Sequence, residues 1–193
     1  MARTAPSHGA NRGSTPRGGT MNSNYKIIIY GVPGSGKTTL ARRLAKKFGV
    51  PHIEADGLRN IAQKGKTLSK APCYFLSTTE AYQAIGERTK ENIILGLFRV
   101  RKALHQTVAA QIKKQKRGFV LEAAFLDPRS LSKICKILLL APSAKDHQKQ
   151  FFVHRKKNTL SREQFRNARI IQQYLIAEAR QLKIPISRNG RRI

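Results

Sequence analysis

The sequence has few residues of several kinds, and each shortage excludes a class of protein. Its 193 residues include two cysteines, no tryptophan, and only 10 acidic residues against 38 lysines and arginines. The two cysteines, Cys73 and Cys135, stand far apart without a Cys-x-x-Cys pair, which argues against a zinc site and against a disulfide scaffold. No apolar run approaches the roughly 18 residues that a membrane helix needs. We therefore expect a cytoplasmic protein with reduced thiols and no membrane span.

The excess of positive charge concerns the partners of the chain rather than its fold. The formal net charge is +28, whereas the 40% content of hydrophobic residues is ordinary for a globular protein of one domain. Residues 1–24 contain three arginines, no acid and no apolar periodicity, and they predict a disordered basic tail. Because the tail contributes only three charges, about +25 remains on residues 25–193, which we expect to form a single folded domain.

From residue 25 onward, strand patterns alternate with helix patterns. Short apolar and β-branched runs predict strands at residues 25–30, 51–54, 118–122, 134–140 and 184–187. Helical periodicity and capping residues predict helices at 37–48, from Asp56, from the capping-box spacing at Ser77, across 93–112, at 144–156 and at 162–182. The alternation predicts a three-layer α/β domain with a mostly five-stranded parallel sheet that helices cover on both faces.

A phosphate-binding motif follows the first predicted strand. Residues 31–38 read Gly-Val-Pro-Gly-Ser-Gly-Lys-Thr, which is the GxxxxGK[ST] pattern at the start of a predicted helix. In this setting backbone N–H groups and the helix N-terminus surround phosphate oxygens. We expect Lys37 to reach the β- and γ-phosphates of ATP and the Thr38 hydroxyl to hold Mg²⁺. The residues that we expect to bind Mg-ATP are Gly31, Gly34, Ser35, Gly36, Lys37, Thr38 and Thr39.

Two acidic residues lie at the ends of predicted strands. Glu122 ends the third strand, beside the phosphate-binding loop, and is expected to hold Mg²⁺ directly or through water. Asp56 follows the second strand, at the edge where open α/β sheets bind ligands, and is expected to take a proton from an acceptor hydroxyl. Its alternative role is that of a helix cap. Arg59, one turn later, is expected to bind an acidic acceptor.

A basic segment follows the helix predicted at 144–156. Arg155 precedes a polar joint, and we expect it to belong to a helical lid that covers the transferred phosphate. Arg162 and Arg166 recur at helical spacing and are expected to add substrate contacts. The alternative for this stripe is a solvated helix face.

The order of these features resembles the P-loop small-molecule kinases, and within them most closely the archaeal 2-phosphoglycerate kinase family. Residues 56–59, Asp-Gly-Leu-Arg, are similar to the Asp-x-Ile-Arg of that family, residues 119–122 to the end of its third strand, and residues 147–155 to its His-x-x-x-Phe-x-x-Arg segment. Residues 122–125, Glu-Ala-Ala-Phe, depart from its Glu-Gly-x-His. The segment 155–172 also resembles the lid of dephospho-coenzyme A kinases.

The resemblance implies a P-loop kinase fold and in-line transfer of the γ-phosphoryl group of Mg-ATP. It implies that Lys37 stabilises charge, Asp56 acts as the base, Arg59 binds the phosphate or carboxylate of the acceptor, and Arg155 closes from the lid. The acceptor is then the hydroxyl of a small acidic or phosphorylated metabolite. It also implies that the adenine lies near residues 185–188.

The surplus charge supports a second interpretation. ATP and a phosphorylated, carboxylated acceptor together carry only about seven negative charges, far fewer than the net positive charge of about +25 on residues 25–193. Basic clusters at residues 113–117 and 188–192 are suited to nucleic acid phosphates. The charge therefore leaves open a nucleic-acid-directed P-loop NTPase or an RNA 5′-hydroxyl kinase, and the resemblance of segment 155–172 leaves open a dephospho-coenzyme A kinase.

Overall fold

The fold is built on one parallel sheet. The computed structural model describes residues 24–153 and 158–188. The strands are β1 (Lys26–Tyr30), β2 (His52–Glu54), β3 (Phe119–Ala123), β4 (Lys136–Leu140) and β5 (Ile186–Ser187). They form a five-stranded sheet in the order β2-β3-β1-β4-β5, with every neighbouring pair parallel. The predicted sheet is confirmed, and the carboxyl ends of β1, β2 and β3 meet at one edge.

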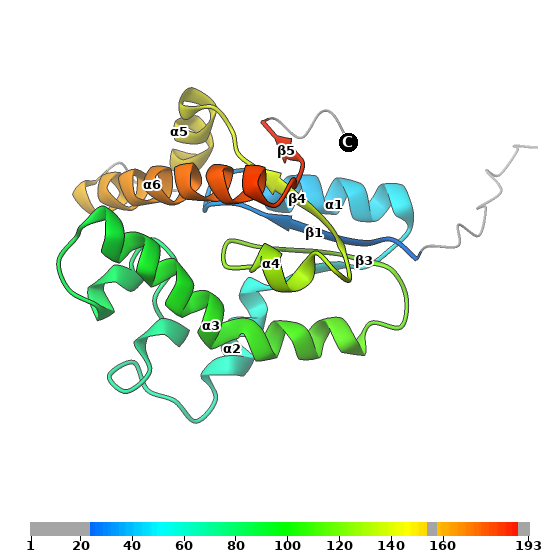
Figure 1. The fold of residues 1–193 in the computed structure, drawn as a ribbon, viewed down its shortest axis with the longest axis horizontal. Coiled ribbons are helices and arrows are strands. Elements are labelled where there is room, and N and C mark those ends of the chain that lie inside the picture. Colours follow the sequence, from blue (N-terminus) through cyan, green and yellow to red (C-terminus); the bar gives the residue numbers. More distant parts are fainter. Residues whose placement is uncertain (1–23, 154–157, 189–193) are drawn as a thin grey trace, which may run out of the picture.

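Helices cover the sheet on both faces (Figure 1). The α-helices are α1 (Lys37–Phe48), α2 (Asp56–Gln63), α3 (Lys90–Lys114), α4 (Pro128–Leu131), α5 (Ala144–Phe152) and α6 (Thr159–Gln181), and the short 3₁₀ helices are η1 (Pro72–Tyr74) and η2 (Ala81–Ala84). One hydrophobic cluster joins α1 to the sheet, and a larger one joins the opposite face to α2, α3, α4 and α6. The three-layer α/β prediction is therefore confirmed. Within the described ranges, no helix is long and apolar enough to cross a bilayer.

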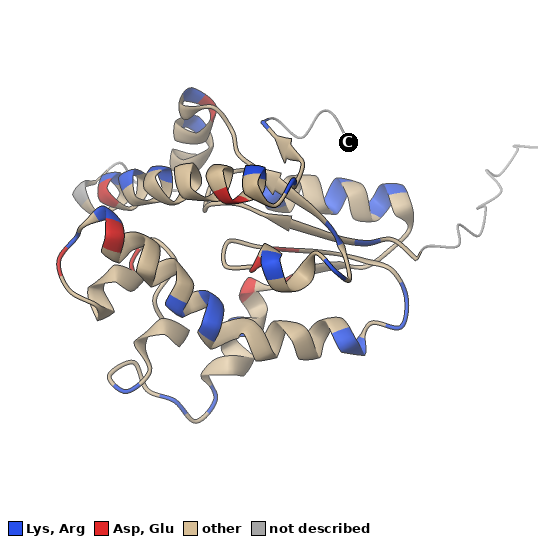
Figure 2. Cartoon of the chain, in the orientation of Figure 1, with Lys and Arg blue, Asp and Glu red and all other residues tan. Residues whose placement is uncertain are grey.

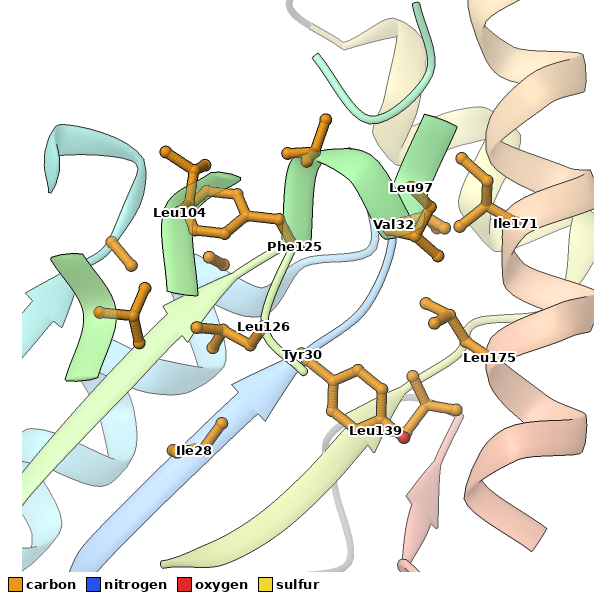
Figure 3. Packing of buried hydrophobic residues seen from close by; sticks show 14 of the residues in the cluster. Ile28, Tyr30, Val32, Leu97, Leu104, Phe125, Leu126, Leu139, Ile171 and Leu175 are labelled. Carbon is orange, nitrogen blue, oxygen red and sulfur yellow. The ribbon is translucent and has the colours of Figure 1, made fainter. Parts of the chain in front are cut away.

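The larger cluster contains the apolar face that the periodicity across residues 93–112 predicts. The periodic side chains of α3 at positions 93, 97, 100, 104, 108 and 112 are all buried, and Figure 3 shows Leu104 beside Phe125 and Leu97 beside Val32. A buried ion pair also ties α3 to α6, because the Arg101 guanidinium donates two hydrogen bonds of 2.9 Å to the Glu178 carboxylate. The packing fixes the position of the segments between β2 and α3, which surround the candidate site.

Three local predictions about helix starts are wrong. The N-cap of α2 is Ala55, so Asp56 is the first helical residue and does not cap it. No α-helix begins at Ser77, because its hydroxyl donates to the Glu80 carboxylate (2.6 Å) and the backbone turns into the short η2. Residues 161–164, Ser-Arg-Glu-Gln, have the spacing of a capping box and predict that Ser161 caps the helix at 162–182, but the cap of α6 is Asn158, whose side chain accepts from the backbone of Ser161.

Candidate functional site

The phosphate-binding motif forms a glycine-rich loop between β1 and α1. Gly34 and Gly36 adopt left-handed backbone angles, φ +75° and +88°, which favour glycine. A Cβ atom at Gly34 would lie 2.8 Å from the Cα atom of Phe151, so the loop is packed closely beneath α5. The Lys37 ammonium group donates to the carbonyl of Val32 (3.0 Å), which folds the lysine back across the loop. The loop therefore has the strand–loop–helix setting that the motif requires.

A cavity of about 600 Å³ opens at this loop. All the predicted nucleotide-binding residues line it except Gly31, which lies beneath the loop against the carbonyl of Leu140. The cavity continues past Gln150 and Val153 to Arg188, at the end of β5. Its walls are thus the loop backbone, the start of α1 and the segment near which the family resemblance implies an adenine. Such a site fits the phosphates and the base of a nucleotide.

The Thr38 hydroxyl and Glu122 form the corner suited to a metal ion. Thr38 Oγ1 donates to Glu122 Oε1 (2.8 Å), and the Glu122 side chain is almost fully buried, with 2% of the residue exposed. Burial raises the pKa of the Glu122 carboxyl above its usual range, and the nearby Lys37 ammonium and the Thr38 hydrogen bond lower it only in part. A hydroxyl and a carboxylate are oxygen ligands of the kind that Mg²⁺ takes together with substrate phosphates. These two residues fit the predicted role.

Asp56 lies near this corner in the first turn of α2, and Arg59 follows one turn later, within electrostatic reach of Asp56. The exposed Asp56 carboxylate lies close enough to Glu122 to raise its pKa. Arg59 is held in place, because its guanidinium donates to the carbonyls of Leu76 (2.6 Å) and Tyr74 (3.3 Å). The guanidinium also stacks 5.3 Å from the ring centre of Phe125, which follows β3. Asp56 and Arg59 follow β2 in the sequence, but the fold places them next to residues at the end of β3. It thereby brings a carboxylate and a fixed cation together.

The arginines predicted for the lid are not brought to this site by the described contacts. Arg155 lies outside the described residues. Arg162 and Arg166 are exposed on α6, and neither is among the described side chains that line the cavity. Their contribution to substrate binding stays a prediction.

Two residues of α5 hold the loop, and the sequence did not single them out for this role. His147 is fully buried, and its Nε2 atom forms a 2.9 Å hydrogen bond with the carbonyl oxygen of Pro33. The side-chain amide of Gln150 donates to the carbonyls of Gly34 (3.1 Å) and Ser35 (3.2 Å). The sequence favours a packing or surface role for His147, and only its place in the 147–155 segment marks it. Because α5 leads directly toward the predicted lid, these bonds link the loop to that segment.

Comparisons with known proteins agree with this architecture. A family model described as an AAA domain, AAA_17, matches residues 30–132. Adenylate kinase of Thermodesulfovibrio yellowstonii is 31% identical over 98 residues, which is 50% of this chain and 39% of that protein. Adenylate kinase of Archaeoglobus fulgidus is 31% identical over 107 residues, or 55% of this chain and 41% of that protein. The chain thus aligns with about two fifths of the length of these relatives.

A solved structure with the same fold is shikimate kinase from Bacteroides thetaiotaomicron, with a TM-score of 0.50 and 16% identity. The match covers 86% of this chain and 86% of that one. At this level of identity the likeness shows the fold alone.

Proposed function

Because the chain belongs to the AAA_17 family and has the fold of P-loop kinases, we propose that it is an ATP-dependent phosphotransferase. It moves the γ-phosphoryl group of Mg-ATP to the hydroxyl group of a small acidic or phosphorylated metabolite. One observation carries this proposal: the Asp56 carboxylate lies within electrostatic reach of Glu122, which bonds to Thr38, and the anchored Arg59 lies within reach of Asp56.

The residues of the chain divide the chemistry among them. Mg-ATP supplies the transferable phosphoryl group and an ion that neutralises its oxygens. The loop amides bind the phosphates, and Lys37 exchanges its contact with the carbonyl of Val32 for a phosphate oxygen. The hydroxyl oxygen of the acceptor bonds to the γ-phosphorus while the bond between the γ-phosphorus and the bridging β-phosphate oxygen breaks. Asp56 accepts the proton that the acceptor hydroxyl loses. Arg59 orients the acceptor through its anionic group.

Two lines of support favour different acceptors. The resemblance to the 2-phosphoglycerate kinase family favours a phosphorylated hydroxy acid, for which Arg59 supplies a charge-assisted contact. The adenylate kinase relatives make nucleoside monophosphates a second class of acceptor to test. Dephospho-coenzyme A and RNA with a 5′-hydroxyl complete the set that the sequence leaves open.

The test is phosphoryl transfer from radiolabelled ATP to each of these acceptors in the presence of Mg²⁺. We expect one small acceptor to be labelled, and we expect Lys37→Ala and Asp56→Asn each to lower the rate by about 10²-fold or more. Glu91→Gln is the matched control, since Glu91 is likewise the acidic residue in the first turn of a helix, at the remote start of α3. It should retain the wild-type rate. ATP hydrolysis that only RNA stimulates, with no change in Asp56→Asn, would contradict the proposal.

A further inference from the structure

A second cavity, of about 960 Å³, lies on the outer side of α3. It is bounded by the middle of α3, by η1 and by the segment at the start of α4. None of its lining residues is shared with the cavity at the phosphate-binding loop. We call it the α3 groove. Its features are therefore independent of the nucleotide site.

The charge of the α3 groove is predominantly positive. Its lining includes Arg99, Lys102 and Arg129, together with Arg101, which is paired with Glu178, against the single carboxylate of Asp127. Arg129 is partly neutralised, because it lies 3.6 Å from the buried Glu178. Arg99 and Lys102 are exposed, and neither forms an ion pair with another residue of the described chain. Two cations one helical turn apart thus stand ready for an external anion.

Aromatic rings lie among these cations. Phe98 is 41% exposed, although its neighbour Leu97 is fully buried. Its ring packs edge-on against Tyr174, with centroids 5.4 Å apart, and this contact fixes its orientation. Tyr74 lines the groove from η1. Tyr74 is half-buried, so Phe98 is the exposed ring of this basic groove, and such a ring is a platform on which an unpaired base stacks.

The positive surface continues along α3 beyond the groove. Lys113 is exposed and follows Lys102 by eleven residues, close to three full turns, so it faces the same side roughly 16 Å away. Figure 2 shows Lys and Arg both in the middle of α3 and at its C-terminal end. A ligand that fits this arrangement is a chain with repeated negative charge rather than a compact metabolite.

We propose that the α3 groove binds single-stranded nucleic acid. Phosphates contact Arg99 and Lys102, a base stacks on Phe98, and the strand continues toward Lys113. An acidic peptide would satisfy the cations but would leave the aromatic rings without a matching partner. A duplex would hide its bases from Phe98. The binding is separate from phosphoryl transfer and requires no nucleotide in the loop cavity.

The experiment measures fluorescence anisotropy of a labelled 12-nucleotide single-stranded RNA of mixed sequence, titrated with the full chain without ATP. We compare Arg99→Gln/Lys102→Gln with Lys46→Gln/Lys47→Gln, which removes the same charge from exposed positions at the end of α1, on the opposite face of the sheet. We expect the groove variant to bind at least tenfold more weakly, and its log–log salt slope to fall by about 0.7 for each lost phosphate contact. Phe98→Leu should also weaken binding without changing that slope.

Each outcome decides for or against the groove. Equal loss in both double variants would overturn it, because the binding would then follow net charge alone. Equal affinity for a 12-residue poly-glutamate peptide or for a duplex of the same length would overturn it as well. Retained binding of Mg-ATP by the groove variant checks that the domain is folded. A negative result here would overturn the α3 groove proposal without affecting the proposed phosphotransferase activity. The transfer assay with a small acceptor contains no nucleic acid, so the two proposals are tested separately.

Discussion

At the scale of single residues, Glu122 shows how far the sequence leads. Its place at the end of a strand predicts a metal-binding carboxylate, and the structure confirms that it faces Thr38. The depth of its burial could not be predicted, since it depends on the register in which β3 lies between β1 and β2. The same holds for Arg59, whose anchoring carbonyls belong to a segment 15 or more positions away. Spacing identifies the chemistry of such residues, while the sheet decides what surrounds them.

The buried charge of Glu122 leads to a prediction about stability. Burial raises the pKa of this carboxyl, so the folded protein holds its proton more readily than the unfolded chain does. The stability that follows is present at acid pH and is lost as pH rises through the raised pKa. Glu122→Gln removes the charge and keeps an oxygen that accepts from Thr38. We expect the ligand-free variant to melt about 2 °C or more above the wild type at pH 7.5.

The same substitution should lower phosphoryl transfer by about 10²-fold, because the metal corner loses its negative ligand. Thermal melts of both proteins at pH 4.5 and pH 7.5 check the stability part. The difference in melting temperature should shrink at the lower pH. A variant that is less stable than the wild type at pH 7.5 would show that the charged carboxylate is fully compensated in the folded state.

At the scale of elements, local pattern predicts the long helices and the sheet but fails where tertiary contacts compete. The apolar side chains that recur along α3 predict a buried face, and all of them are buried. This prediction succeeds because it depends on helical spacing within one segment. The helix predicted at Ser77 fails because Glu80 bonds to Ser77 and to Gln164 of α6 (2.6 Å), a contact between residues 84 positions apart. The packing of α5 on the phosphate-binding loop is missed for the same reason. Its partners are more than 100 positions apart, at His147 and Pro33.

The contact between α5 and the loop makes Gly34 a critical position. An alanine there would need a left-handed backbone and would place its Cβ atom against Phe151, so the loop or α5 must move. We expect Gly34→Ala to weaken ATP binding at least tenfold. Gly49→Ala is the matched control, since Gly49 has φ +63° but nothing within 4 Å of the added atom. It carries the same backbone strain without the clash.

Isothermal titration with ATP and Mg²⁺ separates the two effects. Gly49→Ala should lower the melting temperature, by a strain of about 1 kcal/mol, and bind ATP as the wild type does. Gly34→Ala should lose affinity even at temperatures where it is fully folded. Equal affinities for the two variants would show that α5 adjusts freely and does not position the loop.

At the scale of the whole molecule, the net charge can be counted from the sequence, but the positions of the charges in the folded protein cannot. The net charge of +28 leaves a nucleic acid partner open as an alternative and says nothing about where such a partner would bind. The fold sorts the charges, since two of the ten acids, Asp56 and Glu54, lie within electrostatic reach of a third, Glu122, at the metal corner. The middle of α3, by contrast, presents cations toward solvent. The fold therefore places negative charge at the metal corner and positive charge along the middle of α3.

This sorting predicts two salt effects of opposite sign in one protein. Repulsion among the surplus cations destabilises the compact state, and salt screens it over about 10 Å at 0.1 M. We expect the melting temperature of protein freed of nucleic acid to rise between 25 and 500 mM KCl, while the affinity of the α3 groove for single-stranded RNA falls over the same range. Thermal melts and anisotropy titrations in matched buffers measure both. In Arg99→Gln/Lys102→Gln, with two fewer charges, both effects should be smaller.

A melting temperature that falls with salt would contradict this prediction. It would mean that attraction within ion pairs outweighs the repulsion among the surplus cations. The buried pair of Arg101 and Glu178 would contribute little to such a fall, because salt screens a buried pair far less than surface charges.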